Sequence, residues 1–162
     1  MKLPTARLLG LLVLCIAIPL IIGIIGSFFT MPEVGGWYAG LQKPSFNPPA
    51  WIFGPVWTLL YILMGVSLWL VIRDGMSSRP VQQAVALFAV QLALNLAWSV
   101  IFFGMHLIAV AFIEVLILVI FIIATMLTFR RINPTAGWLF VPYLCWTAFA
   151  SVLTGTLWFL NG

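Results

Sequence analysis

The sequence predicts an all-α membrane protein, a bundle of five transmembrane helices. Two observations lead to this fold class. First, 64% of the 162 residues are apolar and 6% are charged, whereas a soluble globular domain carries about 25% charged residues. Second, five apolar stretches reach the length of about 20 residues that a helix needs to cross a bilayer. The composition excludes a soluble enzyme, a soluble nucleic-acid-binding protein and a disordered tail.

The five predicted spans follow one another along a single integral-membrane domain, residues 1–162. The apolar part of the first span exceeds the roughly 7–15 residues of a signal-peptide core, so a retained helix is favoured over a cleaved signal peptide. Pro80 suits the first turn of the third span. Residues 104–106 allow only a tight break, so the third and fourth spans should be antiparallel neighbours. The expected limits of the spans are 8–29, 51–72, 81–103, 107–129 and 136–160.

One long connection, residues 30–50, separates the first two spans. It contains four prolines and three glycines, so we expect no regular helix there. Such a long connection in a small protein is usually functional. The prolines restrict the backbone and lower the cost of ordering the loop, which predicts a lid over a ligand site. The lid residues would be Lys43, Pro44, Pro48 and Pro49.

The basic residues predict the orientation in the membrane. Five spans place six of the seven basic residues on one side, and Lys43 alone lies on the other. The excess of basic residues on cytoplasmic loops predicts a cytoplasmic N-terminus, with the long loop and the C-terminus outside. The six residues are Lys2, Arg7, Arg73, Arg79, Arg130 and Arg131. Because the charges are scattered between apolar runs, no nucleic-acid partner is expected.

The third span carries two different faces. Small residues repeat every four positions, at Ala89, Ala93 and Ala97, and would let another helix approach closely. We predict that this ridge is a homodimer contact, and the alternative is packing within the bundle. The opposite face combines polar and aromatic side chains and suits an interior site. Its members are Gln91, Asn95, Trp98 and Phe102.

Three tryptophans are expected to lie deeper than the interfacial aromatic belt. Trp57, Trp98 and Trp146 fall inside spans, and each shares a helix face with polar or small residues. Together with Tyr61, Asn95 and Gln91 they would form a flat-walled pocket with a few hydrogen-bonding groups. Such a pocket suits a large planar apolar ligand. The alternative is an aromatic bundle core that binds no ligand.

The sequence contains no usual set of catalytic side chains, and we expect that the protein requires no cofactor. Neither paired carboxylates, a metal site of usual ligand number nor a phosphate-binding glycine motif is present. Glu114 is the one acid well inside a span, and His106 is a candidate partner for it. Cys15 and Cys145 are expected to be buried free thiols.

Three segments carry recognisable motifs. Residues 37–61 read WYAGLQKPSFNPPAWIFGPVWTLLY, residues 94–99 read LNLAWS, and residues 142–150 contain PYLCW followed by FA. These segments resemble the TspO/MBR family, also known as translocator proteins, tryptophan-rich sensory proteins and peripheral-type benzodiazepine receptors. The resemblance covers nearly the whole chain, including the five spans and the long first loop. It implies a five-helix bundle that often forms homodimers.

The resemblance also implies a function. It implies a membrane receptor or transport protein with a pocket under the first loop that binds porphyrins, such as protoporphyrin IX and haem. One alternative is light-dependent degradation of porphyrin by Trp57 and Trp146, and another is a ligand-responsive regulator or scaffold. The ligand-binding positions that match the family motifs are Trp51, Trp57, Tyr61, Asn95, Trp98, Tyr143, Trp146, Phe149 and Ala150.

Two departures from the family pattern lie near the C-terminus. Leu153-Thr154 stands where many members have Leu-Asn, and the last residues lack the Tyr followed by Lys or Arg of the sterol-recognition pattern. Sterol binding is therefore not expected.

Overall fold

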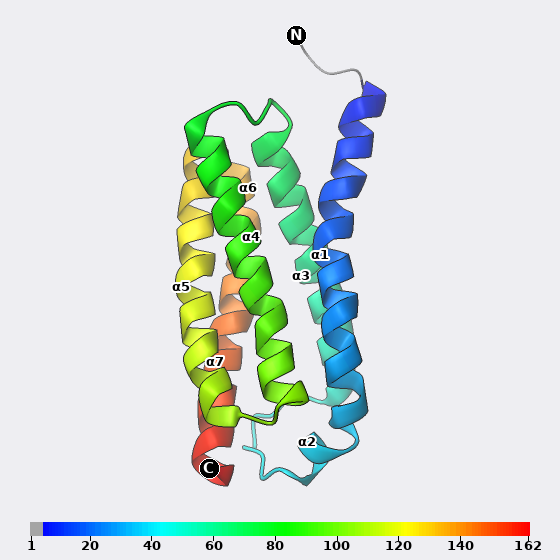
Figure 1. The fold of residues 1–162 in the computed structure, drawn as a ribbon, viewed down its shortest axis with the longest axis vertical. Coiled ribbons are helices and arrows are strands. Elements are labelled where there is room, and N and C mark those ends of the chain that lie inside the picture. The colour runs from blue at the N-terminus through cyan, green and yellow to red at the C-terminus, as the bar shows by residue number, and fades with distance from the viewer. Residues whose placement is uncertain (1–4) are drawn as a thin grey trace.

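The computed structural model describes residues 5–162, and within this range the chain is helical and contains no strand (Figure 1). Five helical segments are long and apolar enough to cross a membrane, which confirms the predicted fold class. The elements are α1 (Thr5–Val34), α2 (Trp37–Gly40), α3 (Ala50–Ile72), α4 (Arg79–Ser99), the π-helix η1 (Val100–Gly104), α5 (Ile108–Ile132), α6 (Pro134–Leu139) and α7 (Val141–Asn161).

Successive long helices run in opposite directions, so the bundle has two distinct ends (Figure 1). We call the end with the start of α1 and residues 73–78 and 133 the basic end. The opposite end, with residues 35–49, 105–107 and the C-terminus, is the loop end. Lys2 lies outside the described residues. Of the other basic residues, Lys43 lies at the loop end, and those at the basic end are Arg7, Arg73, Arg79, Arg130 and Arg131.

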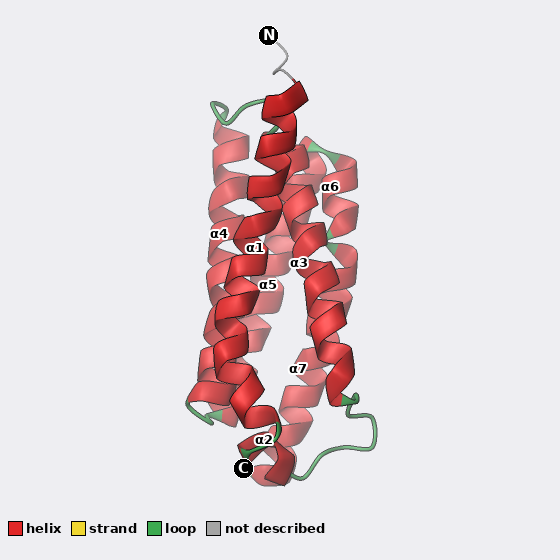
Figure 2. Cartoon of the chain, turned by 90° about the vertical axis from the view of Figure 1, so that its right-hand side faces the viewer, coloured by secondary structure: helices red, strands yellow, loops and turns green. Residues whose placement is uncertain are grey.

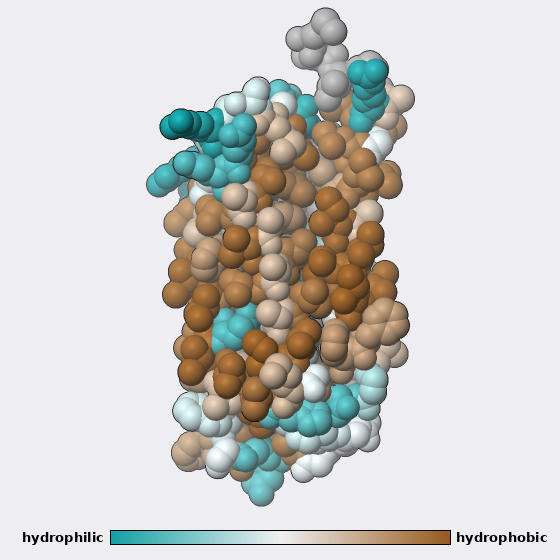
Figure 3. Space-filling view, viewed as in Figure 1, coloured by the Kyte–Doolittle hydropathy of each residue, from teal (hydrophilic) through white to brown (hydrophobic). Residues whose placement is uncertain are grey.

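The surface between the two ends is hydrophobic. Figure 3 shows a broad hydrophobic band with hydrophilic side chains gathered above and below it. Large apolar side chains point outward along this band, among them Val13, Phe28, Ile113 and Ile120. Lipid tails satisfy such a surface, whereas water would not, so the exposed apolar residues fit an integral multi-pass membrane protein.

The long first loop is shorter than predicted, because part of residues 30–50 is helical. Helix α1 continues to Val34 despite Pro32, and α2 adds one further turn. A proline removes its own N–H, and near the end of a helix this loss affects only the last turn. The segments without helical structure are therefore residues 35–36 and 41–49.

The fifth span, expected over 136–160, covers Pro134–Asn161 and is divided into two helices near its start. Helix α6 ends at Leu139, and α7 starts at Val141. Pro142 has no N–H to continue the hydrogen bonding of α6, but it fits the first turn of a new helix. Asn133 caps α6 because its side-chain oxygen accepts a hydrogen bond from the N–H of Ala136 at 3.2 Å.

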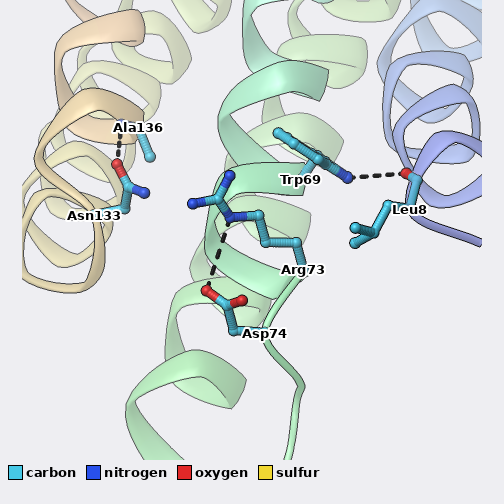
Figure 4. Close-up of polar contacts among 6 residues, drawn as sticks. All are labelled: Leu8, Trp69, Arg73, Asp74, Asn133 and Ala136. Atoms are coloured by element: carbon cyan, nitrogen blue, oxygen red, sulfur yellow. Dashed lines mark hydrogen bonds and ion pairs between the residues drawn. The ribbon is translucent and has the colours of Figure 1, made fainter. Parts of the chain in front are cut away.

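At the basic end the helices approach closely and their polar groups are paired. Gly65 of α3 lies against the backbone of Ile16 of α1, where any side chain would collide. The Ser67 hydroxyl donates to the Ala136 carbonyl at 2.7 Å. Figure 4 shows the Trp69 indole N–H donating to the Leu8 carbonyl at 3.1 Å. This half of the bundle is therefore held by direct contacts between helices.

Candidate functional site

A chain of hydrogen bonds joins three helices in the bundle interior. The Tyr61 hydroxyl of α3 donates to the Asn95 side-chain oxygen of α4 at 2.7 Å. The Asn95 amide donates in turn to the Tyr143 hydroxyl of α7 at 3.1 Å. All three residues are buried. The tyrosine ring of Tyr61 fits because Gly23 of α1 has no side chain. These three predicted site residues are thus brought together.

We call the buried residues Tyr61, Asn95 and Tyr143 the polar centre. Aromatic rings line its loop-end side. Trp57 stacks on Tyr61 with ring centroids 5.5 Å apart and meets the edge of Tyr143 at 6.1 Å. Phe53 meets Trp146 edge-on at 5.9 Å. The backbones of α3 and α7 barely approach each other, and Figure 2 shows the two helices diverging toward the loop end. Aromatic side chains therefore reach across the space between these helices.

The rings at the loop end are half-buried, in contrast to the buried polar centre. Trp57, Trp146 and Phe149 all keep part of their surface exposed. Trp146 packs against Phe149 at 5.6 Å, and Phe149 meets Phe46 of the loop at 6.3 Å. Flat walls with free surface above a few polar groups suit a planar ligand. We call these rings, together with Phe53 and the buried residues Tyr61, Asn95 and Tyr143, the aromatic site.

Trp98 belongs to a neighbouring aromatic cluster. Its ring stacks on Phe102 with centroids 4.9 Å apart and meets Phe103 at 5.9 Å. Phe149 also packs against this cluster and so connects it to the aromatic site. The indole N–H of Trp98 is buried and has no hydrogen-bond partner.

Two other predicted residues take less central places. Trp51, in the first turn of α3, is 74% exposed and is not part of the aromatic contacts. Ala150 is half-buried on α7, next to Phe149 in the chain.

Hydrogen bonds hold the loop 41–49 at two positions, Gln42 and Asn47. The Asn161 side chain at the end of α7 accepts from the Gln42 N–H at 2.8 Å and donates to the Gln42 carbonyl at 2.9 Å. The Tyr38 hydroxyl donates to the Asn47 side chain at 2.7 Å. Burial raises the pKa of Tyr38 above its ordinary value by more than this hydrogen bond lowers it, so Tyr38 remains a donor at neutral pH.

The predicted lid residues lie within this loop. The Lys43 ammonium donates to the carbonyls of Ala39 and Leu41 and lies 4.9 Å from the centroid of the Tyr38 ring. Pro44 and Pro48 are half-buried, while Pro49 is exposed and precedes the first turn of α3. The loop is therefore held in place by these contacts, and Phe46 joins it to the aromatic site through Phe149.

Sequence reasoning missed three residues that help to build the site. Phe53 precedes Trp57 by four residues and lies on the same face of α3, a spacing that was available in the sequence. Phe46 and Asn161 had no such signal, because their partners on α7 and in the loop are more than 100 residues away in sequence.

Glu114 and His106 do not form the expected contact. His106 Nε2 lies 3.1 Å from Glu33 Oε2, and its ring stacks on Trp37 with centroids 4.2 Å apart. Glu114 is 7% exposed, and neither of its carboxyl oxygens has a partner. Across residues 5–162 no three side chains of the metal-ligating types lie close enough to hold a metal ion.

The alanine ridge of the third span points away from the bundle. Ala89 and Ala93 are exposed and Ala97 is half-buried. Packing of this ridge inside the subunit, one of the two alternatives, is therefore excluded for Ala89 and Ala93. The cysteines are free, but Cys145 is exposed on α7, so the expected burial holds for Cys15 alone.

A separate groove lies on the outside of the bundle, between α5 and α7. Phe112 and Leu116 line one side, and Val152, Gly155 and Phe159 line the other. It shares none of the residues of the aromatic site, and its apolar lining is that of a lipid-facing surface.

Comparisons with known proteins extend over almost the whole chain. The family model described as TspO/MBR matches residues 15–159. The "Tryptophan-rich protein TspO" of Chlorobaculum tepidum is 47% identical over 93% of this chain and 95% of its own length. The "Translocator protein" of Homo sapiens is 40% identical over 83% and 80% of the two chains. The "Tryptophan-rich sensory protein" of Cereibacter sphaeroides is 43% identical over 72% of each.

Proposed function

This chain belongs to the TspO/MBR family, and on that premise we propose that it is a membrane receptor or transport protein that binds porphyrins in the aromatic site. Protoporphyrin IX and haem are flat, largely apolar rings with carboxylates at one edge. The arrangement that supports this proposal is the chain Tyr61–Asn95–Tyr143 beneath half-buried aromatic rings. The rings offer stacking surfaces, and the polar centre offers orienting hydrogen bonds.

The loop 41–49 would control access to the bound ring. It is held over the site by Asn161 and by the contact between Phe46 and Phe149. Lys43 lies in this loop and offers a cation to the ligand carboxylates. The relatives named translocator and sensory protein are compatible with a carrier or a receptor.

Quenching of tryptophan fluorescence by protoporphyrin IX tests this proposal. We expect saturable quenching by the purified protein, and an affinity about tenfold or more lower in Trp146→Leu, because a stacking surface is lost. Trp138→Leu is the matched control, since Trp138 is 62% exposed at the basic end and lies over Arg130. Absence of saturable quenching, or equal losses in both variants, would overturn the proposal.

The same complex also tests the alternative of light-dependent degradation. Trp57 and Trp146 are both half-buried, and an electron donor to a bound ring needs such accessible surface. Illumination should then bleach the Soret band of the bound porphyrin. If Trp57→Phe and Trp146→Phe bleach the porphyrin at the same rate as the unaltered protein, these tryptophans have no part in the reaction.

We further propose a homodimer through the alanine ridge of α4. Ala89, Ala93 and Ala97 face away from the polar centre, so association and ligand binding do not compete. Ala93→Leu should give a folded monomer in light scattering after size exclusion. Ala148→Leu, at another exposed alanine, on α7, should leave the dimer intact. A stable dimer in Ala93→Leu would show that this ridge is not the contact.

We propose that the basic end faces the cytoplasm. Five described arginines lie at this end, against Lys43 at the loop end. A Ser45→Cys variant should react with a membrane-impermeant thiol reagent from outside. Labelling from the cytoplasmic side alone would reverse the orientation.

A further inference from the structure

Among residues 5–162, Glu114 is the only acidic side chain buried in the bundle interior. It is 7% exposed, and neither of its carboxyl oxygens has a hydrogen-bond partner. It lies about 9 Å along α5 from the start of this helix at the loop end, and about 27 Å from its other end. An ionisable side chain at such a depth is rare in a membrane protein and is usually functional.

No positive charge in the described part of the chain neutralises Glu114. His106, the basic group that follows η1, is paired with Glu33 at 3.1 Å. The Lys43 ammonium donates to two backbone carbonyls at the loop end. Arg130, on the same helix, is about 24 Å away along the axis. A Glu114 carboxylate would therefore stand in the interior without a counter-ion.

The surroundings of Glu114 on α5 are apolar. Ala111, one turn before it, packs in the cluster that Phe149 also contacts, and Leu118, one turn after it, packs in the cluster that contacts Trp146. Both neighbours are almost fully buried. Glu114 thus lies between two hydrophobic clusters that both reach the aromatic site. Such surroundings disfavour a charge and offer few oxygen ligands to a metal ion, but they accommodate a neutral carboxylic acid.

The chain between Glu114 and the loop end is irregular. The π-helix η1 replaces the last turn before α5, with the Met105 N–H donating to the Val100 carbonyl at 2.9 Å and the Leu107 N–H to the Ile101 carbonyl at 3.1 Å. Single π-helical turns frequently occur at functional sites. The shortest way from Glu114 to water passes this turn, so the loop end is the side from which a proton would reach it.

We propose that Glu114 is a proton-binding site inside the membrane and that its proton exchanges with water at the loop end. The bound proton removes the charge that burial disfavours. Near this depth, α4, η1 and α6 contribute no titratable side chain among the described residues. Tyr61 of α3 and Tyr143 of α7 are the titratable groups of the neighbouring polar centre, and both are hydrogen-bonded to Asn95.

The bound proton would also link Glu114 to ligand binding, and this consequence rests on the proposed function. A charged Glu114 beside the aromatic site repels the carboxylates of a porphyrin, whereas a protonated Glu114 does not. The affinity for protoporphyrin IX should therefore fall by about fivefold or more as rising pH removes the proton. Glu114→Gln stays neutral and should keep its affinity over the same pH range.

Infrared difference spectroscopy of the purified protein tests the proton site without a ligand. The C=O group of a carboxylic acid absorbs at a higher frequency than a carboxylate, so a neutral Glu114 gives a separate band. At neutral pH we expect this band in the unaltered protein and its loss in Glu114→Gln. Asp74→Asn, at an exposed carboxylate of the basic end, is the control and should keep the band. Raising the pH should remove the band reversibly, and replacing K⁺ by Na⁺ should not change it.

Labelling with dicyclohexylcarbodiimide gives a second measurement that needs no variant. A protonated carboxyl group adds across a C=N bond of this apolar reagent, so that its oxygen bonds to carbon and its proton moves to nitrogen. The acyl group then migrates to nitrogen and forms a stable N-acylurea. Mass spectrometry should find this product on Glu114 at neutral pH, and less of it as the pH rises.

The outcomes separate the proton site from the proposed function. If no carboxylic-acid band depends on Glu114 and the carbodiimide leaves Glu114 unlabelled, the proton site is overturned, whatever the porphyrin titrations show. A band that disappears when Na⁺ replaces K⁺ would overturn it in favour of a metal cation. If the band is present but pH changes the porphyrin affinity of Glu114→Gln and of the unaltered protein equally, the link alone fails. If the protein binds no porphyrin, the proposed function and the link fail, and the band still decides the proton site.

Discussion

The two halves of the bundle differ in how they accommodate polar groups inside the membrane. In the basic-end half, Ser67 and Trp69 donate to carbonyl groups of neighbouring helices. In the loop-end half, Trp98 and Glu114 carry buried polar atoms without partners. Gln91 and Thr147, near the middle of the bundle, do so too. Aromatic rings pack tightly around Phe129 in the first half, whereas Trp57 and Trp146 remain half-buried in the second.

This difference indicates that one half of the bundle mainly stabilises the fold and that the other half is suited to binding a ligand. Paired polar groups and close backbone contacts stabilise the basic-end half. Unpaired polar groups cost stability in the absence of a ligand, and a ligand that supplies the missing hydrogen bonds offsets this cost. Substitutions in the first half should therefore change the melting temperature, and substitutions in the second half should change binding.

The largest effect is expected at the contact between α1 and α3. A side chain in Gly65→Ala would collide with the Ile16 backbone, which cannot yield as a flexible side chain would. We expect a loss of about 3 kcal/mol in the free energy of unfolding, visible as a lower melting temperature. Gly54→Ala, in the loop-end half of the same helix, has open space around it and should change little. Equal melting temperatures for the two variants would contradict the comparison.

Two indole groups give a second, matched test. Trp69→Phe removes an N–H that donates to Leu8, whereas Trp98→Phe removes an N–H without a partner. Both lose similar ring area, so the difference between the variants isolates the hydrogen bond. Trp69→Phe should be the less stable by about 1 kcal/mol in thermal melts. The opposite order would mean that the Trp98 N–H has a partner in the membrane.

Side-chain hydrogen bonds hold the connecting segments at both ends of the bundle. These bonds should differ in their effect on ligand exchange. Asn161→Ala frees the loop at Gln42. We expect bound porphyrin to dissociate several times faster, with a stability loss of about 0.5–1 kcal/mol because the bonds are exposed. Gln82→Ala, which removes a similar bond to Met76 at the basic end, should leave the dissociation rate unchanged. Stopped-flow displacement of the ligand measures both rates.

The smallest effect concerns two buried threonines. Thr125 bonds to the Phe121 carbonyl, and the hydroxyl of Thr147 has no partner. Replacing an unpaired hydroxyl with a methyl group of the same shape removes a desolvation cost. Thr147→Val should therefore be more stable than Thr125→Val by about 0.5–1 kcal/mol in thermal melts. A clear loss of stability in Thr147→Val would place an ordered water or another partner at this site.

Much of this architecture could be read from the sequence. Hydropathy alone marks the five spans, because a bilayer requires continuous apolar helices of a given length. The pairing of Tyr61, Asn95 and Tyr143 in one site also followed from helix faces and family motifs. Local rules were less reliable near helix ends, where Pro32 did not end α1 and Pro142 divided the fifth span.

The sequence by itself determined the membrane fold, the segregation of charge and the residues of the polar centre. The fold and the charge segregation depend on composition and hydropathy, which are properties of each helix alone, whereas Tyr143 of the polar centre was implied by the resemblance to the family motifs. Tertiary structure decided that Trp51 stays exposed, that Asn161 holds the loop, and that Glu114 lacks a partner. Each of these depends on the rotation and depth of one helix relative to another, which packing between helices sets and no single segment encodes.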